Sequence, residues 1–306
     1  MKRILTTVMS VMASASGSLR VIATVAILGA VPVATNAPPL LSEVLATNTV
    51  SPVHATALFY TTSGAGTGLP NGAEVFAIKV SSRRITTTDI GPTHGGDCGS
   101  LALSPRGTLY SMCGPLFGAQ QLATIDQKTG RADLFGVAVR RLAVMAMAFA
   151  PNGILYAVGD CHPNAKFECT PDSDPNFNSL YTVNVTTGAF TRVGSTGTPQ
   201  FFMDLAFDRN GKMFGVTTTD NPSTVPAVLY RLDPVTGKAT KIVNLVGNNF
   251  VMGLAFSREG KLYATDDSQN PGLYLINIKT GFETAIAALP FGFSSGLELM
   301  DPDEPR

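Results

Sequence analysis

The phrase Leu254-Ala-Phe-Ser-Arg-Glu-Gly260-Lys-Leu-Tyr263 decides the fold of this chain, because the chain contains it four times. The other copies begin at Leu101, Met147 and Leu205, and each keeps the glycine and the apolar-aromatic ending. A second phrase, Leu273-Tyr-Leu-Ile-Asn277-Ile-Lys-Thr-Gly281, follows after a variable gap, with further copies that begin at Leu122, Leu180 and Leu229. Self-similarity at a period of tens of residues is typical of repeat architectures.

Each unit predicts four short antiparallel strands. Its apolar residues alternate or cluster in short runs bounded by Gly, Pro, Asn or Asp, a pattern that is typical of strands rather than helices. The first phrase contains strands a and b around a glycine turn, and the second contains strand c and the Thr-Gly turn that leads to strand d. Glycine allows such tight turns because it adopts positive φ without steric cost. Four antiparallel strands per unit indicate a propeller blade.

The two ends of the chain complement each other. The first unit opens at strand b, near Leu58, and lacks a strand a. The last apolar segment, Ser295 to Met300, reads as a strand a without a strand b. Pairing them closes a ring and removes exposed sheet edges. We therefore predict an all-β, five-bladed β-propeller whose C-terminal strand completes the N-terminal blade. The predicted blades are 58–90 with 296–300, 101–136, 145–194, 202–245 and 252–288.

The two phrases resemble the repeats of secreted bacterial β-propellers of the NHL, YVTN and gluconolactonase-like type over residues 58–300. The resemblance implies the fold. Those repeats serve lactonases, quinoprotein-like domains and binding platforms alike, so the resemblance implies no single activity. The chain contains no Trp, so the Trp-Asp signature of another propeller class is absent.

The N-terminus predicts export. Basic residues (Lys2, Arg3 and Arg20) precede an apolar run from Val21 to Val33 and small residues up to Ala37. This is the order of a secretory signal, and the run is too short to span a bilayer. We expect a signal peptide at 1–37, with an uncleaved anchor as the alternative, then a lead-in segment at 38–56, one propeller domain at 57–300 and a tail at 301–306. The mature chain would be secreted or periplasmic, with no integral membrane segment.

The charge of the mature chain argues against nucleic acid as a partner. Loss of residues 1–37 leaves 19 basic against 22 acidic residues. The sequence contains no arginine-rich run or basic patch of the kind that binds phosphate backbones. The predicted partner is instead a protein, a glycan or a small ligand.

Strand order places every long connection at one end of the blades. The a–b and c–d turns are short, whereas the b–c and d–a loops at the other end carry the insertions 61–72, 91–100, 160–178, 217–226 and 266–271. Loops on one side of a rigid scaffold are where binding function usually lies. We call this side the loop end and the other side the turn end.

All four cysteines lie at the loop end. Cys98 and Cys113 flank one hairpin, and the register of that hairpin places them opposite each other, so a cross-strand disulfide is expected. Cys161 and Cys169 bracket a short loop and are expected to form a disulfide that closes it. An even number of cysteines in an exported chain favours disulfides over free thiols. A metal site is the rival interpretation, although no Cys-x-x-Cys spacing exists.

One stretch of the loop end has ligand-like spacing. Asp172, Asp174 and Asn176 place oxygen donors at every second position, which suits a hard cation such as Ca²⁺. The glycine and the distant glutamate of a helix-loop-helix calcium loop are missing, and Asx-rich turns also occur without metal. Calcium is the only cofactor that the sequence suggests.

The residues expected around the central axis argue against an enzyme. A gluconolactonase-like resemblance implies a divalent ion held there by Glu, Asp and Asn. The aligned pairs are Gly99-Ser100, Met145-Ala146, Met203-Asp204, Met252-Gly253 and Ser295-Gly296, in which Asp204 is the only acid. The methionines indicate core packing, or an apolar ligand channel as the alternative. His94, Asp97 and Ser100 are close in sequence, but a triad is defined by geometry.

The sequence therefore predicts a non-catalytic exported propeller that binds its ligand through the b–c and d–a loops. One alternative is a hydrolase or lactonase that uses Asp204 with loop acids such as Asp97, Asp160 or Asp267. The other is a structural or envelope protein whose loops bind no ligand.

Overall fold

The computed structural model describes residues 57–63, 71–81, 84–115, 119–140, 142–161, 178–218, 226–247, 250–266, 271–292 and 294–300. Every regular element in these ranges is a β-strand, and none is a helix long and apolar enough to cross a membrane. The expected signal peptide, lead-in segment and tail lie outside the described residues. Asp172, Asp174, Asn176, Cys169 and Asp267 also lie outside them, as do the side chains of Asp160 and Cys161, so these assignments stay predictions.

The strands form five four-stranded antiparallel sheets, which are the blades. Blade 1 contains β20 (Ser294–Met300), β1 (Ala57–Ser63), β2 (Glu74–Val80) and β3 (Ile85–Pro92). Blade 2 contains β4 (Cys98–Leu103), β5 (Leu109–Cys113), β6 (Gln120–Ile125) and β7 (Ala132–Val139). Blade 3 contains β8 (Leu142–Phe149), β9 (Leu155–Cys161), β10 (Ser179–Val183) and β11 (Phe190–Ser195). Blade 4 contains β12 (Phe201–Phe207), β13 (Met213–Thr218), β14 (Val228–Leu232) and β15 (Ala239–Asn244). Blade 5 contains β16 (Val251–Phe256), β17 (Leu262–Asp266), β18 (Gly272–Ile276) and β19 (Glu283–Ala288).

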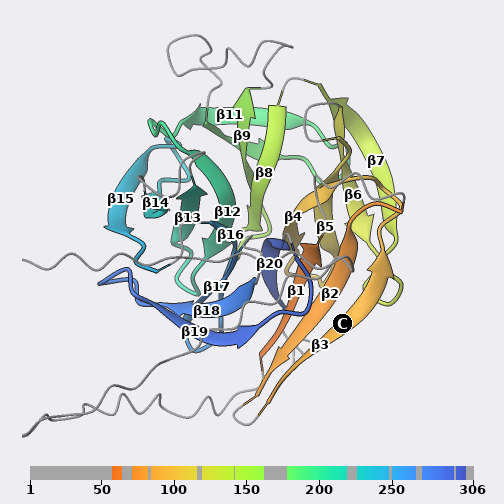
Figure 1. Cartoon of the computed structure of the whole chain (residues 1–306). Helices are drawn as coiled ribbons and strands as arrows, with labels where there is room; N and C mark the ends of the chain where they lie inside the picture. Colours follow the sequence, from red (N-terminus) through yellow and green to blue (C-terminus); the bar gives the residue numbers. More distant parts are fainter. Residues whose placement is uncertain are drawn as a thin grey trace, which may run out of the picture. The chain divides into compact units, whose positions relative to one another are not determined.

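The five-bladed propeller is confirmed. The innermost strands of successive blades, β20, β4, β8, β12 and β16, contact one another in a closed ring (Figure 1). The C-terminal strand β20 pairs with β1, with Leu58 opposite Met300 and Thr61 opposite Leu297. The last strand of the chain therefore completes the first blade as its innermost strand, as the sequence predicts.

The second repeat phrase forms a capped turn. Asp126 accepts hydrogen bonds from the backbone N–H groups of Lys128 and Thr129, at 2.8 and 2.9 Å. These hydrogen bonds hold the pKa of Asp126 below its ordinary value, because they favour the carboxylate. Asn184, Asp233 and Asn277 accept equivalent bonds in the other blades. The Asx residue of the phrase is therefore a local turn determinant.

The glycine of the same phrase allows the backbones of neighbouring blades to approach closely. Gly130 has φ of 77°, and a Cβ there would overlap the carbonyl group of Gly91 in blade 1. Gly237 and Gly281 meet the preceding blade in the same way, at Gly194 and Asn244. Backbone hydrogen bonds accompany the approach, such as Val246 N to Gly281 O at 2.8 Å. The repeated Thr-Gly turn thus lets each blade dock its backbone against its neighbour.

Aromatic residues at one repeat position pack between blades. The pairs and their ring-centroid distances are Tyr110 with Phe149 (5.4 Å), Tyr156 with Phe207 (5.7 Å) and Phe214 with Phe256 (5.0 Å). Each pair joins the second strand of one blade to the innermost strand of the next. The interface between blades 5 and 1 uses Tyr263 and Phe59 instead, at 4.9 Å.

The docking role of the Thr-Gly turn predicts unequal costs for two glycine substitutions. Gly107 and Gly130 both have positive φ, but a Cβ on Gly107 would meet nothing within 4 Å. Gly107→Ala should lower the free energy of unfolding by about 1 kcal/mol through backbone strain alone. Gly130→Ala should lower it by about 2 kcal/mol more, because blade 1 must move. Urea denaturation measures both, and equal losses would contradict the docking role.

Candidate functional site

Every innermost strand carries a one-residue β-bulge near the loop end. The extra residues are Ser100, Met145, Met203, Met252 and Gly296. They fall into two classes, since Ser100 and Gly296 have left-handed backbone, with φ of 47° and 69°. Bulges redirect side chains and often lie beside functional sites. The bulges divide the loop end of the axis into a methionine side in blades 3–5 and a small-residue side in blades 1 and 2.

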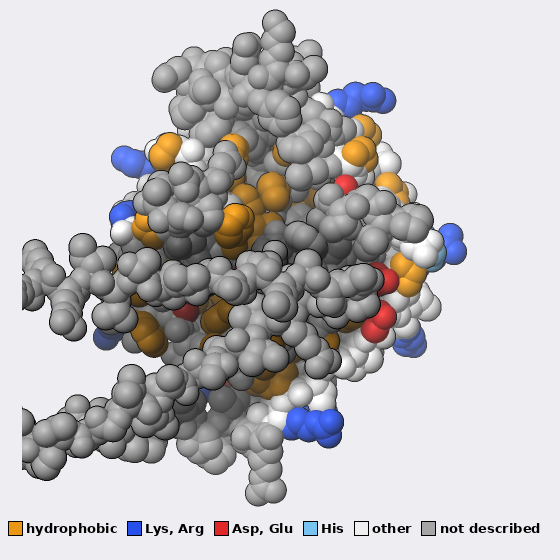
Figure 2. Space-filling model, in the orientation of Figure 1, with side chains coloured by type: hydrophobic (Ala, Val, Ile, Leu, Met, Phe, Trp, Pro, Cys, Tyr) orange, Lys and Arg blue, Asp and Glu red, His pale blue; other side chains and the backbone are white. Residues whose placement is uncertain are grey.

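The methionine side is a single apolar cluster. Met203 is buried within the core shared by blades 4 and 5, and Met145, Phe201 and Met252 are half-buried and pack against that core. Four side chains from three blades therefore gather at the loop end of the axis. We call Met145, Phe201 and Met252, the three that retain exposure, the apolar rim. On the face that Figure 2 presents, hydrophobic side chains lie near the centre and Lys and Arg lie at the margin.

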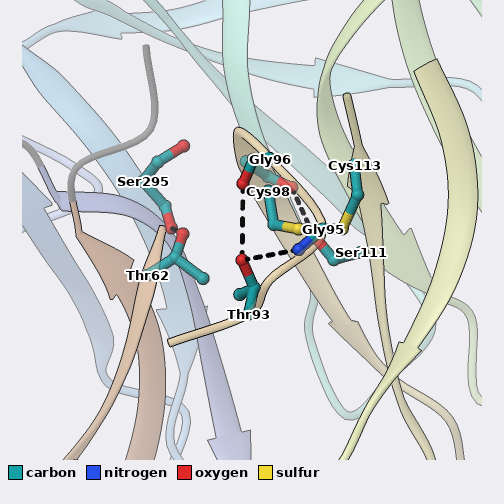
Figure 3. Close-up of a disulfide and its surroundings, with 9 residues drawn as sticks. Thr62, Thr93, Gly95, Gly96, Cys98, Ser111, Cys113 and Ser295 are labelled. Carbon is teal, nitrogen blue, oxygen red and sulfur yellow. Dashed lines mark hydrogen bonds between the residues drawn. A yellow bond between two sulfur atoms is a disulfide. The ribbon is translucent and has the colours of Figure 1, made fainter. Parts of the chain in front are cut away.

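The other side is lined by hydroxyl groups. The Oγ1 of Thr61 lies 2.9 Å from the Oγ of Ser294, which donates to the Oγ1 of Thr265 at 2.9 Å. Thr62 Oγ1 donates to the carbonyl oxygen of Ser295 at 2.7 Å (Figure 3). All five residues are buried, and they join β1, β17 and β20. The ring closes between blades 5 and 1 through this hydrogen-bonded cluster.

Asp204 lies fully buried at the axis and connects three innermost strands. Its Oδ1 accepts from the N–H of Leu205 at 2.9 Å. Its Oδ2 accepts from Leu254 in β16 at 2.7 Å and from Leu297 in β20 at 3.1 Å. Burial raises the pKa of Asp204 well above its ordinary value, and the neighbouring Glu298 raises it further, whereas the three N–H groups oppose the shift.

Glu298, one residue after Leu297 in β20, also accepts backbone N–H groups from innermost strands. Backbone N–H groups of Leu103 in β4 and of Leu299 donate to its carboxyl group. Burial raises the pKa of Glu298 to about 8. In the other four blades, the equivalent position is Ala102, Ala148, Ala206 or Ala255. The closing strand therefore carries an acid where the repeat has a methyl group.

The axial residues do not fit a divalent metal ion. The positions that align with Asp204 are Ser100, Ala146, Gly253 and Gly296, which supply no second carboxylate. The neighbouring carboxyl group of Glu298 accepts the backbone N–H groups of Leu103 and Leu299. Both oxygens of Asp204 already accept backbone hydrogen bonds. Within the described ranges, no group of three His, Cys, Asp or Glu residues could hold a metal. The donor set at the axis therefore suits backbone N–H groups rather than a cation.

Of the loop acids that the sequence suggests as partners for Asp204, only Asp97 has a described side chain. Asp97 is half-buried in the loop before β4, and its backbone carbonyl accepts from Gly114 at 3.0 Å. Asp266, which no sequence motif marks, is buried and accepts from the N–H of Gly272. His94 is exposed, and Ser100 Oγ is buried with no hydrogen-bond partner among the described residues, so the two do not form a hydrogen-bonded pair.

One predicted disulfide is confirmed. Cys98 and Cys113 face each other across β4 and β5 with a Cα–Cα distance of 4.1 Å and are bonded (Figure 3). The loop 93–97 folds over this disulfide, held by Thr93 N to Ala73 O at 2.8 Å and Ala73 N to Gly96 O at 3.0 Å. Gly95 packs close to the Cys98 sulfur. The connection between blades 1 and 2 is therefore fixed at the loop end.

Comparison with known proteins identifies a family. Residues 63–288 match the family described as a repeat of unknown function, DUF6923. The chain belongs to this family. No curated protein matches the DUF6923 chain.

Several solved structures are similar to this DUF6923 protein at low sequence identity. TolB from Acinetobacter baumannii is 10% identical with a TM-score of 0.49, over 79% of this chain and 66% of that chain. A gluconolactonase from Xanthomonas campestris is 11% identical with a TM-score of 0.45, over 79% and 80%. The PQQ-bound aldose sugar dehydrogenase from Streptomyces coelicolor is 13% identical with a TM-score of 0.45, over 81% and 90%.

Asp204 should be a determinant of stability. Asp204→Ala leaves three buried N–H groups without an acceptor, and we expect a loss of about 3–5 kcal/mol in the free energy of unfolding. The control is Asp208→Ala, which removes an acceptor of two N–H groups in a partly exposed turn and should cost about 1 kcal/mol. Urea denaturation compares the two, and an equal or smaller loss for Asp204→Ala would contradict the axial role.

Glu298 should make stability fall as pH rises. An acid whose pKa is higher in the folded than in the unfolded chain holds its proton more tightly when folded, so its contribution is full below about 4.5 and is lost as pH rises through about 8. Glu298→Gln keeps the neutral shape and should flatten this part of the pH profile of the free energy of unfolding. Urea titrations at several pH values across this window measure the slope, and an equal slope in the native chain and the variant would show that Glu298 titrates normally.

Proposed function

We propose that this DUF6923 protein is an exported, non-catalytic binding propeller whose ligand contacts the apolar rim at the loop end of the axis. The observation that carries the proposal is the contrast between the two groups of axial residues. The carboxyl groups of Asp204 and Glu298 accept backbone hydrogen bonds and so are committed to closing the ring. Glu298 is half-buried as well, so the contrast is one of chemistry: Met145, Phe201 and Met252 offer half-buried apolar surface to a ligand.

The chemistry of the apolar rim supports binding through apolar contact. Methionine is flexible and polarisable and adapts to irregular apolar surfaces, and aromatic side chains are frequent at binding sites. The cluster is fixed beneath by Met203 and flanked by buried hydroxyl groups, so the rim is supported by a rigid scaffold. We infer a ligand that is a protein, a glycan or a small molecule with an apolar face.

Export is part of the proposal. The basic and apolar order of residues 1–37 supports it, and the Cys98–Cys113 disulfide agrees with an oxidising compartment. In this proposal, the protein is periplasmic or extracellular and binds its ligand at the loop end.

Variants of the rim test the proposed site. The full mature chain is immobilised and exposed to an envelope extract of the source organism, and the retained molecules are identified by mass spectrometry. Met145→Asp and Met252→Asp should abolish retention, because they place charge in an apolar contact. Val235→Asp is the matched control, since Val235 is 81% exposed in a turn of blade 4, and it should retain the same molecules.

Two results would contradict the proposed function. One is retention that both rim variants leave unchanged while their unfolding transitions match the native chain. The other is hydrolysis of a lactone or ester by the purified protein that Asp204→Asn abolishes without loss of folding, which would support the alternative of a hydrolase.

A further inference from the structure

Three cations surround an open concavity at the turn end of blade 4. The concavity has a volume of about 570 Å³, and its lining includes Lys212, Arg231, Lys238 and Thr240. Arg231 lies opposite Phe214 in β13 and opposite Thr240 in β15. Lys212 lies directly before β13 and Lys238 lies directly before β15, so strand pairing brings both residues and Arg231 to the turn end of blade 4. All three line the same concavity.

Their positive charges are not balanced by the chain. All three cations are exposed, and none forms an ion pair with a described residue. The single acid in the lining, Asp233, accepts the backbone N–H groups of Val235 and Thr236 at 2.8 and 3.2 Å. A second carboxylate, Asp208, accepts the backbone N–H of Lys212 at 2.8 Å just outside the lining. The two acids leave an excess of one positive charge around the concavity. Like charges at neighbouring positions of a sheet repel, so the arrangement suits an anion.

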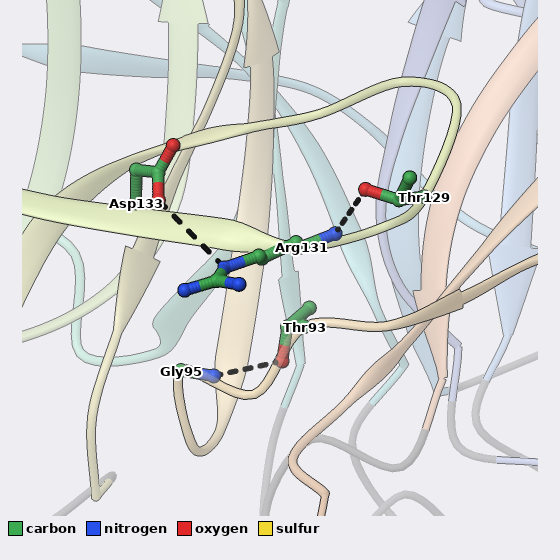
Figure 4. A network of polar contacts seen from close by, with 5 residues as sticks. All are labelled: Thr93, Gly95, Thr129, Arg131 and Asp133. Carbon is green, nitrogen blue, oxygen red and sulfur yellow. Dashed lines mark hydrogen bonds and ion pairs between the residues drawn. The ribbon is translucent and has the colours of Figure 1, made fainter.

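Other blades do not reproduce this set. In blade 2, Arg131 takes the place of Lys238, but Asp133 takes that of Thr240 and lies 3.9 Å from it as an ion pair (Figure 4). In blade 5, Lys261 takes the place of Lys212, while Leu275 and Phe282 replace the other two cations. The repeat itself therefore does not require three cations here.

We propose that Lys212, Arg231, Lys238 and Thr240 form a binding site for a phosphate group. A guanidinium binds two phosphate oxygens at once, ammonium groups add point charges, and a hydroxyl donates a further hydrogen bond. The excess of positive charge favours an anion, and strand pairing brings together the segments that carry the donors. The site lies at the opposite end of blade 4 from the apolar rim, so it is independent of the function proposed for that rim.

Titration of the full mature chain with inorganic phosphate at low ionic strength tests the site by calorimetry. Arg231→Ala and Lys238→Ala should each weaken binding about tenfold, the change expected for loss of one charge-assisted hydrogen bond. Lys261→Ala is the matched control, because it removes the equivalent lysine of blade 5, and it should change the affinity less than about twofold. Added salt should weaken binding.

A second arm distinguishes free phosphate from phosphate in a lipid headgroup. Sedimentation with phosphatidylglycerol vesicles, compared with phosphatidylcholine vesicles, detects the membrane source, and Arg231→Ala should abolish it. Binding of either probe that depends on Arg231 and Lys238 supports the site. Absence of binding to both probes, or equal weakening by Lys261→Ala, would overturn it.

Discussion

The structure depends on how the innermost strand edges are satisfied where the five blades meet. Backbone N–H groups that point toward the axis have no sheet partner, and leaving them buried without an acceptor is costly. Asp204 accepts three of them from β12, β16 and β20, and Glu298 accepts others from β4 and β20. Two acids therefore connect four of the five innermost strands, including the strand that arrives last in the sequence. Both carboxyl groups thus complete the backbone hydrogen bonding of the ring.

A second constraint acts at the periphery, where backbone meets backbone. The Asx-x-x-Thr-Gly phrase recurs because each part has its own physical task. The Asx side chain caps the turn, and the glycine removes the Cβ that would strike the preceding blade at Gly91, Gly194 or Asn244. Aromatic pairs such as Tyr156 with Phe207 fill the space between these points. The repeated residues thus maintain contact between blades, which leaves the residues that depart from the repeat as the candidates for function.

The residues that depart from the repeat form separate groups at the two ends of the blades. At the loop end, Met145, Phe201 and Met252 form the apolar rim beside a cluster of hydroxyl groups, and the Cys98–Cys113 disulfide fixes the adjacent connection. At the turn end of blade 4, Lys212, Arg231 and Lys238 replace the mixed or apolar residues of other blades. A rigid ring suits such an arrangement, because each blade can change its exposed residues while the contacts at the axis and between blades stay the same.

The sequence alone determined the blades, their order and the pairing of Cys98 with Cys113, because repeats, turn glycines and hairpin register are local properties of the chain. It also determined the closing strand, because the strand missing from the first unit matches the spare strand at the end of the chain. It also located Asp204 at the axis. It did not reveal that Asp204 accepts N–H groups from Leu254 and Leu297, which are distant in sequence and adjacent only once the ring has closed. The basic concavity was likewise hidden, because no run of basic residues exists and Lys212, Arg231 and Lys238 come from three segments that strand pairing brings together. Tertiary structure decided these features because they depend on which strand edges and faces meet in space.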